Sequence, residues 1–269
     1  MRINTNLNGM IATNQMSKNT ALAGNSMEKL STGLRITKAG DDAAGLAVSE
    51  KMRAQIRGME QAERNVQDGI SMVQTAEGAL EEAGNIAQRM RELGVQAGND
   101  TLADDDRQKI KTELEQLQKE MVSISSETKF NGNSLLDGTK TTFSIQAGAG
   151  TEVREITMEN LSSIASSLSL ITVTSTTFAQ GYVSVVDKAL TSINTARANL
   201  GAMQNRLEYT SSNLTTSTEN LTAAESRIRD VDVAKEMVKL SKLNILNQAS
   251  QAMVSQAKQQ PESVSQLLR

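Results

Sequence analysis

The sequence has no cysteine, histidine or tryptophan, and it contains only one proline, two tyrosines and three phenylalanines in 269 residues. Without cysteine and histidine it cannot form a thiolate nucleophile, a histidine-based triad, or a zinc or iron–sulfur site of the usual kinds. Scarce proline favours long uninterrupted helices. A core poor in aromatic rings must consist of Leu, Ile, Val, Met and Ala, which suits a thin rod better than a thick globule.

Charge and hydropathy exclude further classes of protein. The net charge is −3, and no basic face interleaved with aromatic residues occurs, so we expect no nucleic-acid binding. The longest uncharged stretch, residues 160–186, contains 11 Ser or Thr and therefore predicts no membrane span. The first residues, MRINTN, lack the apolar run of a secretory signal. The sequence thus predicts a soluble chain without a cleaved signal peptide.

The longest regular pattern lies in residues 186–228. There an apolar residue occupies every seventh position without a polar substitution, which indicates one long helix with a coiled-coil-like stripe of roughly 60 Å. A stripe of that length cannot bury itself, so other helices must match it. The predicted rod-core stripe consists of Val186, Ile193, Leu200, Leu207, Leu214, Leu221 and Ile228.

Two further segments supply matching helices. Residues 45–98 carry a second seven-residue repeat from Met52 to Ala87, and residues 104–127 carry a third apolar stripe. The acidic run Asp104–Asp106 opens that third helix, where compensation of the helix dipole explains it better than a metal site does. The sequence therefore predicts that 186–228 packs against 45–98, with 104–127 completing the rod.

The middle of the chain changes character. The dipeptides Asn131-Gly132 and Asp137-Gly138 predict turns. Two short apolar segments, with Phe143 and Ile145 before residues 147–150 and Val153, Ile156 and Met158 after them, predict a small β-hairpin within about 129–160. A Ser/Thr-rich connector follows over 160–180. The predicted fold class is mainly α: a long antiparallel helical coiled-coil-like rod with a small β-hairpin, and terminal helices pairing into an inner coiled-coil domain. We place that inner domain at 1–40 and 232–269, and the outer rod domain at 41–231.

Eight motifs in order along the chain carry a family resemblance. They are MRIN at 1–4, LSTGLRI at 30–36, AGDDAAGLA at 39–47, QTAEGAL at 74–80, FNG at 130–132, LLDG at 135–138, NLTAAESRIRD at 220–230 and LLR at 267–269. The chain resembles bacterial flagellin over nearly its whole length, in a minimal form without large variable outer domains.

The resemblance implies a structural subunit that polymerises into the flagellar filament for motility. It implies secretion through the flagellar export apparatus to the extracellular flagellum, and it implies no cofactor. The partners that it implies are other copies of the chain, an export chaperone, the filament cap and hook-junction proteins, and the animal Toll-like flagellin receptor.

The receptor motif of the family matches QRMREL at 88–93, with Glu113 on the following helix. The candidate receptor-recognition residues are therefore Arg89, Leu93 and Glu113. Arg89 and Leu93 are four residues apart on one helix, and a helical hairpin that turns near residue 101 brings Glu113 level with Arg89. An ordinary solvated face remains the alternative interpretation. Gly94 stands where flagellins usually have Ala or Val.

The C-terminal segment 236–269 is rich in large apolar residues that a single subunit cannot bury alone. We predict that residues of about 1–40 and 232–269 are disordered in the free subunit and fold together when neighbouring subunits or a chaperone cover them. The candidate assembly and chaperone-binding residues are Met237, Val238, Ile245, Leu246, Met253, Leu267 and Leu268.

Two other classes of protein were weighed against a flagellin. An enzyme with paired carboxylates is disfavoured, because the acidic residues lie mostly at helix starts and on solvent faces, and no apolar pocket is indicated. A flagellin-like hook–filament junction protein or a non-polymerising coiled-coil adaptor is disfavoured by the motifs of the long helices. Pelleting of long filaments would separate the polymer subunit from the adaptor.

Overall fold

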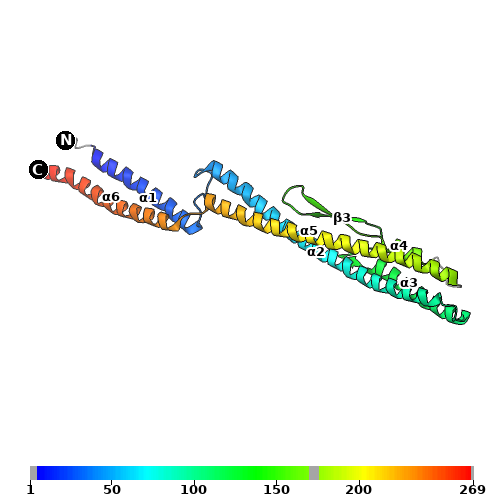
Figure 1. Cartoon of the computed structure of the whole chain (residues 1–269). Coiled ribbons are helices and arrows are strands. Elements are labelled where there is room, and N and C mark those ends of the chain that lie inside the picture. The colour runs from blue at the N-terminus through cyan, green and yellow to red at the C-terminus, as the bar shows by residue number, and fades with distance from the viewer. Residues whose placement is uncertain (1–4, 170–175, 268–269) are drawn as a thin grey trace. The chain divides into compact units, whose positions relative to one another are not determined.

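A computed structural model describes residues 5–169 and 176–267, with side chains up to residue 259. Within these ranges the chain forms six helices and two small antiparallel hairpins, which confirms the mainly α fold class (Figure 1). The elements are α1 Leu7–Thr32, α2 Ala43–Ala97, α3 Asp104–Glu127, β1 Lys129–Phe130, β2 Asn133–Ser134, β3 Thr142–Gln146, β4 Val153–Thr157, α4 Leu161–Leu168, α5 Thr176–Arg229 and α6 Val233–Leu267.

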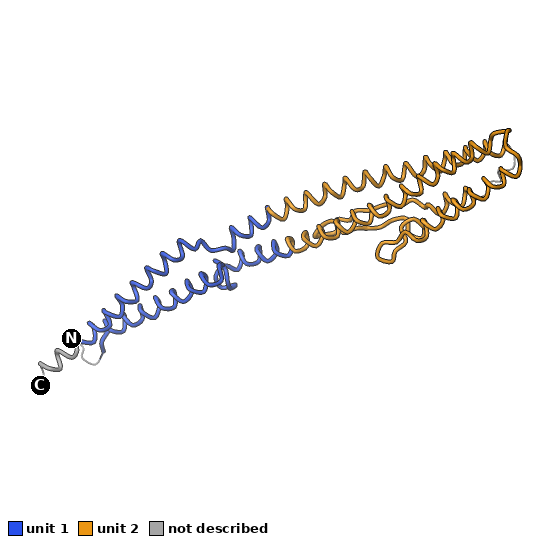
Figure 2. The backbone as a smooth tube through the Cα atoms, turned by 90° about the horizontal axis from the view of Figure 1, so that it is seen from below, with its two compact units in different colours: residues 1–54, 220–269 blue, residues 55–219 orange. Residues whose placement is uncertain are grey.

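The chain divides into two compact units (Figure 2). Unit 1 consists of residues 1–54 and 220–269, and unit 2 consists of residues 55–219. Both divisions lie inside the continuous helices α2 and α5, where no linker composition marks them. The sequence instead placed its domain boundaries at the two interruptions between helices, and those boundaries stay a prediction.

Unit 2 is built on an antiparallel pairing of α2 with α5. Arg91 Nε donates to Asp187 Oδ1 at 2.6 Å, and Thr215 Oγ1 donates to Glu63 Oε1 at 3.3 Å. Between these contacts α2 runs back from 91 to 63 while α5 runs forward from 187 to 215, which is 28 residues on each helix. The two seven-residue repeats therefore stay in register over four heptads.

The rod-core stripe predicted on α5 is buried only along unit 2. Val186, Ile193, Leu200, Leu207 and Leu214 are buried there, whereas Leu221 and Ile228 belong to unit 1 and are half-buried. The sequence reading missed a second buried row on α5. Its members are Tyr182, Ala189 and Ala196, each four positions before a large residue of the stripe, and alanine gives only a weak periodic signal.

The structure has the predicted hairpin, β3–β4, and a second one, β1–β2, that the sequence did not predict. Hairpin β1–β2 turns through Asn131 at φ 48° and Gly132 at φ 81°, as a two-residue turn with both central residues left-handed requires. Hairpin β3–β4 is paired from Thr142↔Thr157 to Gln146↔Val153.

The predicted connector over 160–180 includes the short helix α4. Asn160 caps it by accepting a hydrogen bond from the Ser163 N–H at 2.9 Å. Leu161, Ala165 and Leu168 are buried at a helical spacing, and α4 packs against α3. The serines of this segment lie mostly on the other faces of the helix. The sequence therefore contains a short amphipathic helix within a Ser/Thr-rich stretch that composition alone predicts to be a connector.

Candidate functional site

In unit 1 two linkers lie side by side: residues 33–42 between α1 and α2, and residues 230–232 between α5 and α6. Gly33 ends α1 in the left-handed conformation, at φ 72°. The Arg35 N–H then donates to the Arg229 carbonyl at 2.6 Å, and the Val231 N–H donates to the Gly33 carbonyl at 3.0 Å. These two backbone hydrogen bonds hold the end of α1 beside the start of α6, and so they position the two terminal helices.

Ion pairs surround the linkers. Arg229 binds Glu50 at 2.6 Å, and this contact lowers the pKa of the Glu50 carboxyl below its ordinary value. Lys38 binds Glu28 at 2.8 Å, which raises the pKa of the lysine. On α6 the pKa of Glu236 is lowered by the nearby Ser26 hydroxyl and by the Lys239 ammonium. Charge is thus concentrated at the linker end of the terminal helices.

The contact between α1 and α6 is antiparallel and thin. Asn6 Nδ2 donates to the Ala257 carbonyl at 2.6 Å, and Asn19 Nδ2 donates to Ser250 Oγ at 3.4 Å. The buried side chains of the pair are small or polar, with one large exception: Asn19, Ala23, Ser26, Leu243 and Ala257. Small side chains remove little apolar area from water, so this contact alone stabilises the pair weakly.

The larger apolar side chains of the same helices are exposed. Val238 is 71% exposed and Ile245 is 65% exposed. Together these residues form what we term the assembly face: Leu7, Met10, Ile11, Leu22 and Met27 on α1, and Val233, Met237, Val238, Ile245, Leu246 and Met253 on α6. Scattered apolar residues are ordinary on a protein surface, but a concentration of this kind on two paired helices marks an interaction surface.

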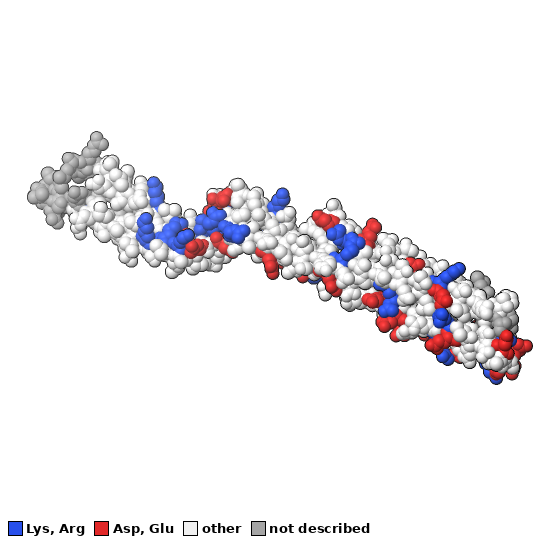
Figure 3. All heavy atoms as spheres, in the orientation of Figure 1, with Lys and Arg blue, Asp and Glu red and all other residues white. Residues whose placement is uncertain are grey.

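Charge is also missing from this part of the chain. Residues 5–17 and residues 243–257 contain no Asp, Glu, Lys or Arg. On the face drawn in Figure 3, charges of both signs are mixed over unit 2, while few charged atoms appear on the terminal helices. Covering such a surface avoids the large free-energy cost of removing ionised groups from water.

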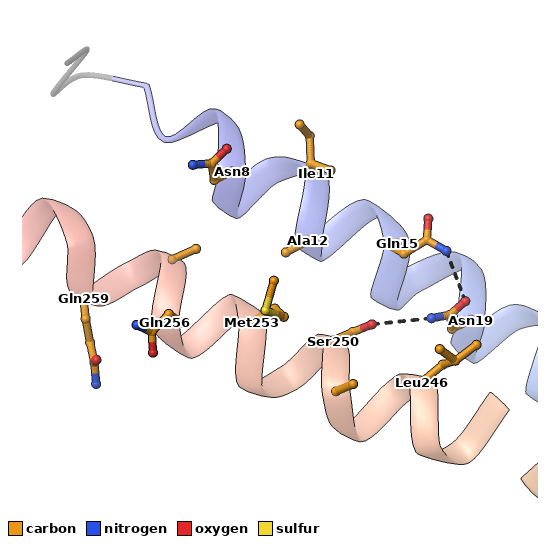
Figure 4. A pocket seen from close by; sticks show the side chains of 12 residues that line it. Asn8, Ile11, Ala12, Gln15, Asn19, Leu246, Ser250, Met253, Gln256 and Gln259 are labelled. Atoms are coloured by element: carbon orange, nitrogen blue, oxygen red, sulfur yellow. Dashed lines mark hydrogen bonds between the residues drawn. The ribbon is translucent and has the colours of Figure 1, made fainter. Parts of the chain in front are cut away.

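Two grooves lie along the assembly face. One, of about 790 Å³, runs between α1 and α6 and is lined by Ile11, Leu246 and Met253 among others. Figure 4 shows Met253 pointing toward α1, whereas Ile11 points away from α6. The second groove, of about 470 Å³, lies on α6 beside Val238 and Ile245.

The apolar residues of α6 do not share one side of the helix. Met237 and Val238 are sequence neighbours, and therefore lie about 100° apart around the axis. Since α1 covers one side only, the other apolar side chains need further partners. Five of the seven candidate residues on this segment are exposed; the Leu267 side chain and Leu268 lie outside the described residues. The α1 residues of the face were not among the candidates, although the charge-free stretch 5–17 marks three of them, Leu7, Met10 and Ile11.

The predicted receptor-recognition residues do not share one surface. Arg89 binds Glu113 at 2.9 Å across the α2–α3 hairpin and Glu92 at 3.2 Å, and these contacts raise the pKa of its guanidinium. Leu93 is only 2% exposed, because it falls on the side of α2 that faces the core. Arg89 and Glu113 are therefore the accessible part of the patch. Next to them α2 continues unbroken through Gly94, where an added Cβ would lie 3.1 Å from the Tyr182 ring.

In the part of the chain that the structure describes, no three side chains of Asp or Glu gather as a metal site would require. Among those residues, no helix has the length and apolar content needed to cross a membrane.

Unit 2 has a closed helical core, whereas the helix pair of unit 1 is poor in charge and largely uncovered. This contrast defines the chain as an assembly subunit rather than a self-contained globule. Family comparisons agree with this class. Residues 3–141 match the model of the bacterial flagellin N-terminal helical region, and residues 183–268 match that of the bacterial flagellin C-terminal helical region. The chain belongs to the bacterial flagellin family, whose members are structural subunits of the flagellar filament, an extracellular appendage.

Individual relatives extend over the whole chain. It is 53% identical to a flagellin of Halalkalibacterium halodurans and 48% identical to a flagellin of Bacillus subtilis, with 100% of each chain covered in both cases. A crystal structure of Bacillus cereus flagellin matches with a TM-score of 0.52 at 33% identity, over 60% of this chain and 94% of that one. A putative flagellar hook-associated protein from Vibrio parahaemolyticus has a TM-score of 0.60 at 14% identity, over 71% of this chain and 100% of that one, which shows a shared fold alone.

Proposed function

We propose that the chain polymerises through its assembly face, and that α1 and α6 complete their folding only as neighbouring copies cover them. The observation that carries this proposal is the contrast in burial between the two units. The large residues of the α5 stripe are buried within unit 2, whereas those of α1 and α6 are mostly exposed. A helix pair that buries mainly Ala, Ser and Asn does not remove enough apolar area from water to offset the entropy of ordering it.

Coupled folding also fits the other proposed partners. An export chaperone would cover the exposed residues of α6 before assembly, and the filament cap and hook-junction proteins would present similar helix pairs at the two ends of the polymer. A chain whose terminal helices are unfolded, and which has no disulfide, would pass more readily through a narrow export channel to the extracellular flagellum.

Replacing Val238 or Ile245 with serine should raise the critical concentration for polymerisation by about tenfold or more. Each side chain loses roughly 1.5–3 kcal/mol of burial free energy per subunit contact, and 1.4 kcal/mol corresponds to a factor of ten. The measurement is the amount of pelletable polymer at graded subunit concentrations. Val95→Ser is the matched control, because Val95 is also an exposed helical valine but lies in unit 2. An equal rise in the critical concentration for all three variants would contradict a special role for the assembly face.

We further propose that the animal Toll-like flagellin receptor binds the exposed pair Arg89 and Glu113. Both side chains are half-exposed and they are joined across two helices, so a partner would meet an ordered charged group. Leu93 would contribute indirectly, by packing the helix that carries Arg89. In a polymer this surface would be covered by neighbouring copies, and we therefore expect the monomer to signal and the intact filament not to.

Arg89→Ala should lower receptor signalling by the monomer by about tenfold, because an ordered arginine at the centre of a contact is a typical hot spot. Arg91→Ala is the matched control, since Arg91 is also exposed and ion-paired, with Asp187. A reporter-cell assay at graded monomer concentration makes the comparison. If both variants signalled like the unmodified chain, Arg89 would belong to an ordinary solvated face.

A further inference from the structure

Oxidisable sulfur in this chain is present in methionine alone. The sequence has 13 methionines and no cysteine. Tryptophan and histidine, two other side chains that oxidants attack, are also absent. A peroxide that meets this protein therefore reacts first with those methionine thioethers that solvent can reach.

Burial separates the methionines sharply. Met59, Met72, Met90, Met121 and Met158 are at most 9% exposed, and all belong to unit 2. Met16, Met52 and Met203 are half-buried. The largely exposed methionines of the described chain all lie on α1 and α6: Met10 is 57% exposed, Met27 59%, Met237 49% and Met253 65%.

Two of the four exposed thioethers, those of Met237 and Met253, line the grooves of the assembly face. Met253 lies between α1 and α6 in the larger groove, beside Leu246 (Figure 4). Met237 lines the second groove together with Val238 and Ile245. Each groove thus contains one sulfur atom that is open to solvent in the single subunit.

We propose that Met10, Met27, Met237 and Met253 form an oxidation site that controls polymerisation, an inference that rests on the proposed role of the assembly face. The oxidant is a peroxide. With hydrogen peroxide, the O–O bond breaks as one oxygen atom is transferred to the thioether sulfur, which is oxidised by two electrons. The departing hydroxide takes up the proton of the transferred hydroxyl, so the products are methionine sulfoxide and water.

Oxidation changes the face from apolar to polar. A sulfoxide oxygen accepts hydrogen bonds strongly, and it loses water when a neighbouring copy covers it. Around Met10 and Met253, residues 5–17 and 243–257 contain no Lys or Arg that could donate to it. In the finished polymer the same sulfurs would be covered, so oxidation acts on the free subunit and spares the assembled one. The reaction is reversible, because sulfoxide reductases restore the thioether.

The test uses the full-length chain, treated with hydrogen peroxide, freed of oxidant and polymerised at graded concentrations. Peptide mapping first verifies the added mass of one oxygen atom at each of the four sites. Oxidation should raise the critical concentration on the order of tenfold or more, because an unsatisfied buried polar group at each contact costs at least that factor. Subsequent treatment with a methionine sulfoxide reductase should restore polymerisation.

Two variants locate the effect, each compared with its own untreated sample. For the variant M10L/M27L/M237L/M253L, peroxide should change the critical concentration by less than about twofold, since leucine has no sulfur to oxidise. The variant M52L/M203L is the matched control, because it removes two half-buried methionines outside α1 and α6 and should stay as sensitive as the unmodified chain.

Three outcomes would overturn the inference. In the first, the oxidised chain, with four sulfoxides verified, keeps its untreated critical concentration. In the second, peroxide treatment raises the critical concentration of the fourfold leucine variant as much as that of the unmodified chain. In both cases the untreated, unmodified chain still polymerises, and the proposed function stands. A third outcome is that the untreated chain forms no polymer, in which case the proposed function fails and removes the basis of the inference.

Discussion

Replacing Leu207 with alanine should lower the free energy of unfolding of the chain by about 2–5 kcal/mol. Leu207 is fully buried on α5, and the truncation leaves a cavity in addition to the lost transfer free energy. One of its methyl groups lies close to Gly69 on α2, so the cavity would open at the contact of the two helices. Chemical denaturation followed by circular dichroism measures the loss.

Leu221 supplies the internal comparison for that loss. It has the same residue type and the same heptad position on α5, but it is half-buried in unit 1. Leu221→Ala should therefore destabilise the single subunit by clearly less than Leu207→Ala does. A loss below about 0.5 kcal/mol at Leu207 would contradict burial of the stripe.

Hydrogen exchange should show the largest difference between subunit and polymer. We expect the backbone amides of residues 245–257 on α6 to exchange nearly as fast as in an unfolded chain while the subunit is dilute. After polymerisation their exchange should slow by several orders of magnitude, because they then open only with the contacts around them. Mass spectrometry of peptic peptides makes the comparison.

The amides near Leu80 on α2 are the reference in the same experiment, because unit 2 buries that residue within one subunit. They should be protected in both states. Strong protection of residues 245–257 in the dilute subunit would refute coupled folding of the terminal helices, whatever the polymer shows.

Much of the fold was predictable, because regular repeats carry it. The stripes on α2 and α5 have the same seven-residue period, so their pairing followed from the sequence. The seam of Ala189 and Ala196 did not, since alanine is common on every face of a helix. Helix α4 was missed because its four serines, a residue type that favours loops, outnumber its three buried apolar residues.

The candidate site was predictable in part. The apolar richness of α6 is plain in the sequence, and it led to Met237 and Ile245. Residues 1–40 were predicted to fold on assembly as well, but no single residue of α1 was a candidate, because Asn, Thr and Ser separate its few large residues. Leu93 shows a different limit of such reasoning. A motif shared with a family identifies residues that matter together, but it does not separate those that touch a partner from those that hold the surface in place.

The matched repeats of α2 and α5 have a mechanical consequence for unit 2. Over the four heptads between the Arg91–Asp187 and Glu63–Thr215 contacts, each large side chain fits a space that recurs only after seven residues. Sliding one helix along the other by a single residue would unseat the whole row at once, and the next comparable fit lies about 10 Å away. A pulling load along the helices therefore meets a stiff response and then an abrupt yield, without gradual stretching in between.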